Sequence, residues 1–590
     1  MENIIEEIKG LQINSGALAF YKDFVNQFKV QKNDEVPNNS ESSQKGAVDW
    51  EEDKRRDFLN PRAVASLGQS CLPDCINEKK EDKRKITKIV ENDNWKELSQ
   101  YIDDISSNKK DDENLFEQCI KFHTKIGEFC RKDTPCAVPR LAIHAMINAL
   151  RPESFSRVVK EEILDEIYEY IKNKIVNKSN DSIQTQWEKV ETAWNTSKLE
   201  TDKKDELKKI NKSPDAKQKK ERRQELDWKY DFWYRKSNAI AEFFNTILQE
   251  KQINIDDAYS HPWAFYEKVI KMKNYVQKVL QQKNIILTGA PGTGKTFLAK
   301  EIANNIISEE LQKCNNKEEE KEYRKTHVKI VQFHPSYDYT DFVEGLRPQK
   351  DGKFIRVDGT FKEFCKRAVK SIKKEEEKKE EEKFVFIIDE INRGEISKIL
   401  GELFFSIDPG YRVPKWKINT IFKEPEDDES EDFIRVDTQY QNLIEEDDDV
   451  FKDGFYVPEN VYIIGTMNDI DRSVESMDFA FRRRFAFHEV KAGDSQNMLY
   501  QLEKRAYDAI KKMDDLNEVL VKKCGLITAY QIGGAYFLKL KDVNYSFDRL
   551  WNEYLSGVLY EYFRGEPDAE IKMKILEEAY KKGIDDSSEQ

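Results

Sequence analysis

The feature that most constrains this chain is a complete phosphate-binding loop set between a strand-like and a helix-like segment. The loop comprises Gly289, Ala290, Pro291, Gly292, Thr293, Gly294, Lys295 and Thr296. It follows the apolar run 285–287 and precedes the segment 297–303. Glycines let backbone N–H groups turn toward a phosphate chain, Lys295 reaches the β and γ oxygens, and Thr296 offers a hydroxyl to Mg²⁺. The sequence therefore predicts binding of a nucleoside triphosphate.

An acidic pair supplies a second part of the expected chemistry. The continuous apolar run 384–388 is typical of a strand buried on both faces of a parallel sheet, and it ends in Asp389 and Glu390. Carboxylates there would lie at the C-terminal edge of the sheet, beside the phosphate loop. We expect Asp389 to hold Mg²⁺ through water, and Glu390 to orient or deprotonate the water that attacks the γ-phosphate.

A third cluster follows the apolar run 461–464, which ends near Asn468, an amide suited to hold the attacking water. Further along the chain are Arg482 and Arg483. An arginine supplied by a neighbouring subunit stabilises charge on the transferring phosphoryl group, so these two residues are expected to act in trans. The alternative is a basic helix end, where arginine complements the helix dipole. Without the other motifs, the helix end would be favoured.

Together, these motifs resemble the McrB family, the AAA+ motor subunits of McrBC-type, modification-dependent restriction systems. Besides the phosphate loop, the resemblance rests on the stretches 333–345, 388–393, 465–473 and 482–485. The block 530–537 and the segment 551–563 resemble the family's C-terminal lid. The resemblance extends from residue 260 to residue 565 and does not reach the N-terminal part.

The resemblance implies a specific activity and specific partners. Members of this family hydrolyse GTP rather than ATP, form hexameric rings, and are stimulated by an McrC-like subunit that carries the nuclease. The implied target is DNA, in particular modified DNA. The family signature Met-Asn-x-x-Asp-Arg-Ser corresponds to Met467, Asn468, Asp471, Arg472 and Ser473. Asp471 is therefore expected among the nucleotide-binding residues, but no residue reads out guanine over adenine, and ATP stays open as the substrate.

The expected fold is an α/β AAA+ P-loop NTPase core with a C-terminal helical lid, preceded by a mainly α-helical N-terminal region. We expect the N-terminal region, which would recognise the target, to cover residues 1–255, the nucleotide-binding domain 256–490 and the lid 491–590. Residues 180–250 combine tryptophans with basic residues. This mixture suits nucleic-acid binding by stacking, or a helical hairpin with its tryptophans packed inward. The interleaved acidic residues favour the hairpin.

Two further segments within the core carry recognisable patterns. Residues 345–361 contain two Asp-Gly turn signals around a short alternating run, which predicts a β-hairpin. Such a hairpin would face the ring pore or a partner, or would simply cap the sheet. The acidic blocks 424–432 and 445–449 repel themselves and contain few apolar residues, so we expect mobile loops there.

Composition limits the remaining classes of protein. A net charge of −14 argues against a protein that coats DNA with its whole surface, so any DNA contact needs a local basic patch. Neither a secretory signal nor a membrane-spanning run is recognisable, and no membrane partner is expected. Eight scattered cysteines suit reduced thiols in the cytoplasm, and their spacing does not favour a structural zinc site.

Three functions are compatible with these observations. The leading hypothesis is an NTP-driven ring motor that recognises DNA through its N-terminal part and powers an McrC-like nuclease in bacterial defence. The alternatives are an ATP-dependent remodeller of protein complexes and a nucleotide-switched assembly scaffold. Glu390 and Asn468 argue against the scaffold, because a pure switch has little need of a hydrolytic site. A neighbouring gene for a nuclease would separate the first two.

Overall fold

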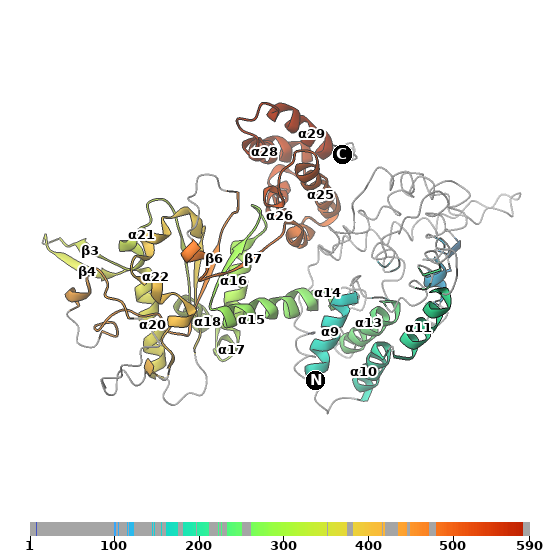
Figure 1. The fold of residues 1–590 in the computed structure, drawn as a ribbon, viewed down its shortest axis with the longest axis horizontal. Helices are drawn as coiled ribbons and strands as arrows, with labels where there is room; N and C mark the ends of the chain where they lie inside the picture. Colours follow the sequence, from blue (N-terminus) through green and yellow to red (C-terminus); the bar gives the residue numbers. More distant parts are fainter. Residues whose placement is uncertain are drawn as a thin grey trace, which may run out of the picture. The chain divides into compact units, whose positions relative to one another are not determined.

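The computed structural model describes most residues from 161 to 581, with isolated residues before them (Figure 1). Within that range it leaves out 175–180, 196, 212–221, 224–225, 227–232, 250–260, 351, 375–381, 416, 419–434, 445–448 and 471–478. The chain divides into two compact units, which we describe separately. One comprises residues 272–494 and 517–535, and the other comprises 1–271, 495–516 and 536–590.

The first unit is built on a five-stranded parallel sheet with the strand order β2-β5-β6-β1-β7. The strands are β1 (Asn284–Thr288), β2 (Val328–Gln332), β5 (Phe384–Asp389), β6 (Val461–Thr466) and β7 (Ala486–Glu489). The three central strands β5, β6 and β1 are almost entirely buried, as their continuous apolar runs predict. The strands expected at the three site motifs are therefore confirmed.

Helices cover both faces of this sheet. On one face, Ile285 and Leu287 pack with residues of α15 (Met272–Gln282), α16 (Lys295–Ile306) and α18 (Lys317–His327). On the other face, Ile286 packs in a core with residues of several further helices. These are α19 (Tyr339–Phe342), α20 (Thr360–Lys374), α21 (Ile396–Leu400) and α22 (Leu403–Ser406). This three-layer arrangement confirms the expected α/β core.

The predicted hairpin is also present. Strands β3 (Glu344–Pro348) and β4 (Phe354–Asp358) pair antiparallel and form a two-stranded arm at the margin of this unit (Figure 1). The arm exposes apolar side chains, and Phe354 is 65% accessible to solvent.

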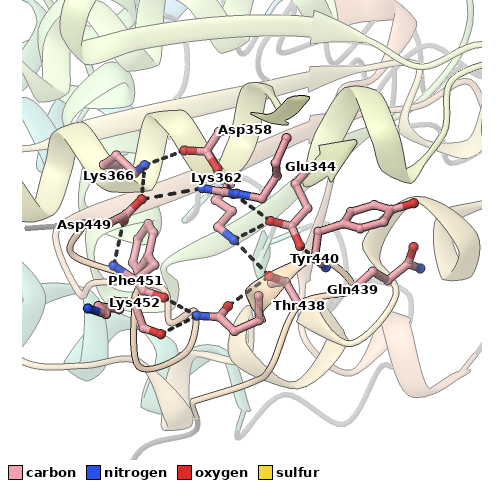
Figure 2. Close-up of polar contacts among 12 residues, drawn as sticks. Glu344, Asp358, Lys362, Lys366, Thr438, Gln439, Tyr440, Asp449, Phe451 and Lys452 are labelled. Atoms are coloured by element: carbon pink, nitrogen blue, oxygen red, sulfur yellow. Dashed lines mark hydrogen bonds and ion pairs between the residues drawn. The ribbon is translucent and has the colours of Figure 1, made fainter. Parts of the chain in front are cut away.

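A buried ionic network fixes the base of the hairpin (Figure 2). Lys362 of α20 and Glu344 of β3 have fully buried side chains, and their Nζ and Oε2 atoms are 2.7 Å apart. Arg356 of β4 contacts Glu344 at 2.9 Å and Asp358 at 2.6 Å. Burial alone would raise the carboxyl pKa values, but the ion pairs outweigh it and hold the pKa of both Glu344 and Asp358 below the usual range.

The same network corrects one expectation from the sequence. Asp449, the last residue of the acidic block 445–449, has a side chain that is 1% exposed. Its Oδ2 lies 2.7 Å from Nζ of Lys366, which also pairs with Asp358. The prediction of a mobile acidic loop was therefore wrong at this residue. Lys366 of α20 and Arg356 of β4 neutralise its carboxylate, although the local sequence shows Asp449 only as one of several like charges that repel one another. The block 424–432 lies outside the described residues.

The second unit includes a helical array formed by α9 (Glu161–Lys174), α10 (Asp181–Trp194), α11 (Ser197–Asn211) and α13 (Trp233–Gln249). Trp187 and Trp233 are buried, as the helical-hairpin interpretation predicts. Nζ of Lys236 on α13 lies 2.8 Å from Glu161 and 2.7 Å from Asp165, both on α9. Trp228 lies outside the described residues.

The C-terminal part of the chain is helical, as expected. Its helices are α25 (Ala506–Lys522), α26 (Gly534–Phe537), α27 (Phe547–Leu550), α28 (Ser556–Tyr562) and α29 (Ala569–Lys581). In the described part of the chain, the shorter helical segments are α14 (His261–Phe265), α17 (Ser308–Leu311), α24 (Phe479–Arg482), the π-helices Tyr266–Lys271 and Trp551–Leu555, and the 3₁₀ segments Ile391–Arg393, Pro409–Tyr411, Gln441–Leu443, Ala492–Arg505, Thr528–Tyr530 and Leu538–Val543. Among the described residues, no helix combines the length and apolarity that a bilayer crossing requires. The predicted domain boundaries at 255/256 and 490/491 stay a prediction.

Candidate active site

The motifs selected from the sequence meet at one edge of the sheet. Strands β1, β5 and β6 run parallel, so their C-terminal ends lie side by side. The phosphate loop follows β1, Asp389 ends β5, and Asn468 lies two residues beyond β6. Side chains more than 90 positions apart in the chain are thereby brought within hydrogen-bonding distance, as the bond from Thr296 to Asp389 demonstrates.

The phosphate loop takes a conformation that only glycine adopts without strain at its turning points. Gly289 has φ 137°, and a Cβ there would lie 2.3 Å from the carbonyl oxygen of Val490. Nζ of the buried Lys295 donates hydrogen bonds to the carbonyl oxygens of Gly289 at 3.0 Å and Ala290 at 2.8 Å. Helix α16 starts at Lys295, so the N–H groups of its first turn face an anion site of the type that helix N-termini provide.

The two predicted metal-binding residues are already in contact. The Thr296 hydroxyl donates to Oδ1 of Asp389 at 2.6 Å. Hydroxyl and carboxylate oxygens are the donors that Mg²⁺ prefers, so the pair fits this ion. Across the described part of the chain, no three His, Cys, Asp or Glu residues form a metal-binding cluster.

Glu390 has an unusual backbone and a side chain held by two neighbours. Its φ of 53° and ψ of 46° place it in the left-handed region, which costs a non-glycine residue roughly 1 kcal/mol. Nδ2 of Asn468 donates to its Oε1 at 3.0 Å, and Nε of Arg393 donates to its Oε2 at 3.2 Å. Nδ2 of Asn392 in turn donates to the carbonyl oxygen of Asn468 at 3.3 Å. The expected catalytic carboxylate and the expected amide thus lie together.

The predicted arginines differ in their exposure. Arg482 and Arg483 are exposed at the end of α24, whereas Arg484 is buried. The Arg484 guanidinium lies 4.3 Å from the ring centre of Phe404 and 3.6 Å from Asp408. Arg484 therefore has a structural role within its own subunit, and the first two side chains remain accessible from outside. Their action in trans stays a prediction.

Asp471, which the family signature assigns to nucleotide binding, lies outside the described residues together with Arg472 and Ser473. Its neighbour Asp469, at a variable position of the signature, is placed close to the phosphate loop. Desolvation raises the pKa of the Asp469 carboxyl, while Lys295 and the N–H group of Gly289 act in the opposite direction. No pattern in the sequence distinguishes Asp469 from other surface carboxylates.

A contact that the sequence motifs do not predict joins the phosphate loop to the segment 532–535. The N–H group of Gly533 donates to the carbonyl oxygen of Pro291 at 2.9 Å, and the N–H group of Ala535 donates to that of Gly292 at 3.0 Å. A Cβ on Gly533 would lie 2.3 Å from the carbonyl carbon of Gly292. The adjacent glycines Gly533 and Gly534 are the sequence feature that could have indicated this contact, because glycine often occurs where two backbone segments approach closely.

Comparison with known proteins gives independent support for the core. Residues 284–485 match the family model described as AAA domain (dynein-related subfamily). The chain is 33% identical over 309 residues to the type IV methyl-directed restriction enzyme EcoKMcrB subunit of Escherichia coli strain K12, and this alignment covers 50% of the chain and 57% of that subunit. It is also 24% identical over 308 residues to the type II restriction enzyme BsuMI component YdiS of Bacillus subtilis strain 168, covering 46% of the chain and 75% of that protein.

Proposed function

The chain belongs to the McrB family of AAA+ proteins, and on that premise we propose that it hydrolyses GTP as the motor subunit of an McrBC-like restriction system. In this proposal it assembles into a hexameric ring, acts on DNA, in particular modified DNA, and drives an McrC-like nuclease subunit in defence against phage. The similarity covers little more than half of the E. coli subunit, so the activity, the DNA target and the partner are part of the proposal.

One observation supports the hydrolytic part most directly. The hydroxyl of Thr296 contacts Asp389 while Glu390 contacts Asn468, so the residues expected to bind the metal and those expected to handle water are adjacent on one sheet edge. Lys295 and the first turn of α16 would bind the phosphate chain, and Mg²⁺ would neutralise its developing charge. The Glu390 carboxylate would accept a proton from the attacking water, which Asn468 would orient. A site of this kind suits turnover better than a nucleotide switch.

Arg482 and Arg483 would complete the site of the next subunit in the ring. Arg482 ends α24 and Arg483 follows it, and both side chains are exposed, so they can reach another protomer. A guanidinium aimed at the γ-phosphate stabilises charge on the transferring group. In this proposal, hydrolysis depends on assembly, and a protomer alone turns over slowly.

The test is a comparison of GTP and ATP turnover by the purified full chain with Mg²⁺, measured as phosphate release. We expect a preference for GTP and a loss of turnover in Glu390→Gln, which keeps the size of the side chain but cannot accept the proton. A preference for ATP would favour the remodeller of protein complexes. Absence of turnover with either nucleotide, despite binding, would favour the assembly scaffold and refute the proposal.

The coupling to a nuclease is tested separately. The gene for an McrC-like nuclease, if it neighbours this one, would supply the partner, and the two proteins would be mixed with methylated and unmethylated DNA. We expect nucleotide-dependent cleavage only when both proteins are present. Cleavage that proceeds equally well with the Glu390→Gln variant would contradict the role as a motor.

A further inference from the structure

Thr466, the last residue of β6, makes two hydrogen bonds, one with the Asp389 carboxylate and one with the backbone of Glu390. It is 2% exposed. Its hydroxyl donates to Oδ1 of Asp389 at 2.6 Å, and the same Oγ1 accepts the backbone N–H of Glu390 at 3.2 Å. One buried hydroxyl thus contacts both the expected metal-binding residue and the backbone of the expected catalytic residue.

The contact with the Glu390 N–H group bears on a strained turn. The left-handed backbone of Glu390 is unfavourable for a residue with a Cβ, and such conformations persist only when the surroundings hold them. A buried N–H group without an acceptor costs additional free energy. By accepting this N–H group, Thr466 stabilises the turn that follows β5, and this turn brings the Glu390 carboxylate to the Asn468 amide.

The contact with Asp389 bears on the metal-binding carboxylate. Oδ1 of Asp389 accepts hydrogen bonds from two hydroxyls, those of Thr296 and Thr466, each at 2.6 Å. Thr296 is itself expected to offer its oxygen to Mg²⁺. Thr466 has no such second task, so its donor is the one that continues to orient Asp389. A hydrogen bond to a charged acceptor is among the stronger kinds in proteins.

We propose that Thr466 is a positioning residue that holds Asp389 and Glu390 in mutual register, so that Mg²⁺ binding and water activation depend on the same hydroxyl. This inference rests on the proposed nucleotide hydrolysis and adds to it a residue through which both carboxylates are oriented. Thr466 contacts neither metal nor nucleotide in this scheme, and it acts only through its two neighbours.

The alternative is that Thr466 merely fills space at the end of a core strand. Valine has nearly the same shape and the same β-branching, but it has no hydroxyl. Thr466→Val therefore keeps the packing of β6 and removes both hydrogen bonds, whereas Thr466→Ser keeps the hydroxyl and removes only a methyl group. Thr246→Val is a matched control, because that hydroxyl on α13 donates only to the carbonyl oxygen of Glu242.

The experiment measures binding of a fluorescent, non-hydrolysable nucleotide to the full-length protein, first in EDTA and then across a Mg²⁺ titration. For Thr466→Val we expect affinity in EDTA within about twofold of the wild type, since the phosphate loop is untouched. The Mg²⁺ concentration for half-maximal tightening should rise about tenfold or more, in line with loss of a hydrogen bond to a charged group. Thr466→Ser and Thr246→Val should remain near the wild type.

Turnover supplies the second readout. In Thr466→Val, kcat should fall about tenfold or more while KM at saturating Mg²⁺ stays within a few-fold, because the orientation of Glu390 affects chemistry more than binding. Wild-type Mg²⁺ dependence and wild-type kcat in a folded Thr466→Val protein would overturn the inference, as would a Thr466→Ser protein as impaired as the valine variant. If Thr466→Val does not fold, Thr466→Ala replaces it under the same criteria.

The proposed hydrolysis and the proposed positioning role of Thr466 can be refuted independently. If the wild-type protein hydrolyses no nucleotide, the proposed function is refuted. The Mg²⁺ titration of nucleotide binding still decides whether Thr466 orients Asp389.

Discussion

Replacing Gly533 with alanine should damage nucleotide binding from a position far along the chain from the phosphate loop, in the block 530–537 that resembles the lid. A Cβ at this residue would lie 2.3 Å from the carbonyl carbon of Gly292, 2.4 Å from its oxygen and 2.5 Å from the nitrogen of Thr293. All three are backbone atoms, so no side chain can rotate away. To reach an ordinary van der Waals contact, the phosphate loop and the segment 532–535 must separate by about 1 Å.

This displacement also breaks the hydrogen bonds that join the two segments, from the N–H groups of Gly533 and Ala535 to the loop carbonyls. Misplacement of catalytic elements by 1 Å can reduce the rate about 100-fold, and we expect a loss of that order in kcat/KM for the nucleotide. The assay is phosphate release against nucleotide concentration, with circular dichroism to confirm folding.

Gly557→Ala is the matched control for this prediction. It lies in α28, and apart from its own residue, its two chain neighbours and the backbone of its own helix, no heavy atom lies within 4 Å of the position its Cβ would take. Alanine is a better helix former than glycine, so this variant should match the wild type in activity and should not lose stability. A Gly533→Ala protein with wild-type nucleotide affinity and turnover would refute the argument that the close approach fixes the loop.

Two further predictions concern the ring and the hairpin. A Lys295→Ala protein mixed with an Arg482→Ala/Arg483→Ala protein should recover hydrolysis, since each supplies what the other lacks; confirmed co-assembly without recovery would count against arginines acting in trans. Acid should loosen the base of the β3–β4 hairpin. Folding lowers the carboxyl pKa values of Glu344 and Asp358. Their contribution to stability is therefore complete above the unfolded values of 4.5 and 3.8, and it is lost as the pH falls through the folded values. Hydrogen exchange of residues 344–358, corrected for intrinsic rates, should show protection that declines below about pH 4.5, and pH-independent protection between pH 6 and pH 3 would contradict this.

Much of the core could be predicted because its signals are local. Buried parallel strands are continuous apolar runs, and polar residues at their ends must lie at one sheet edge, so Asp389 and Asn468 could be placed near the phosphate loop without coordinates. The β3–β4 hairpin was likewise marked by its own turn residues. The acidic residues interleaved with the basic ones correctly favoured tryptophans packed inward over stacking on nucleic acid, as the buried Trp187 in α10 and Trp233 in α13 show.

The features that escaped prediction depend on contacts between distant parts of the chain. Asp449 belongs to a block of like charges, and only its contact with Lys366, 83 positions away, makes it a buried ion-pair partner. Thr466 ends an apolar run like many other threonines, and it matters because its hydroxyl reaches Asp389, 77 positions earlier. Gly533 contacts the backbone of Gly292 in the phosphate loop, although the two residues are far apart in the sequence. In each case the residue type is compatible with several environments. Its role depends on the partner that folding places beside it, and neither composition nor periodicity identifies that partner.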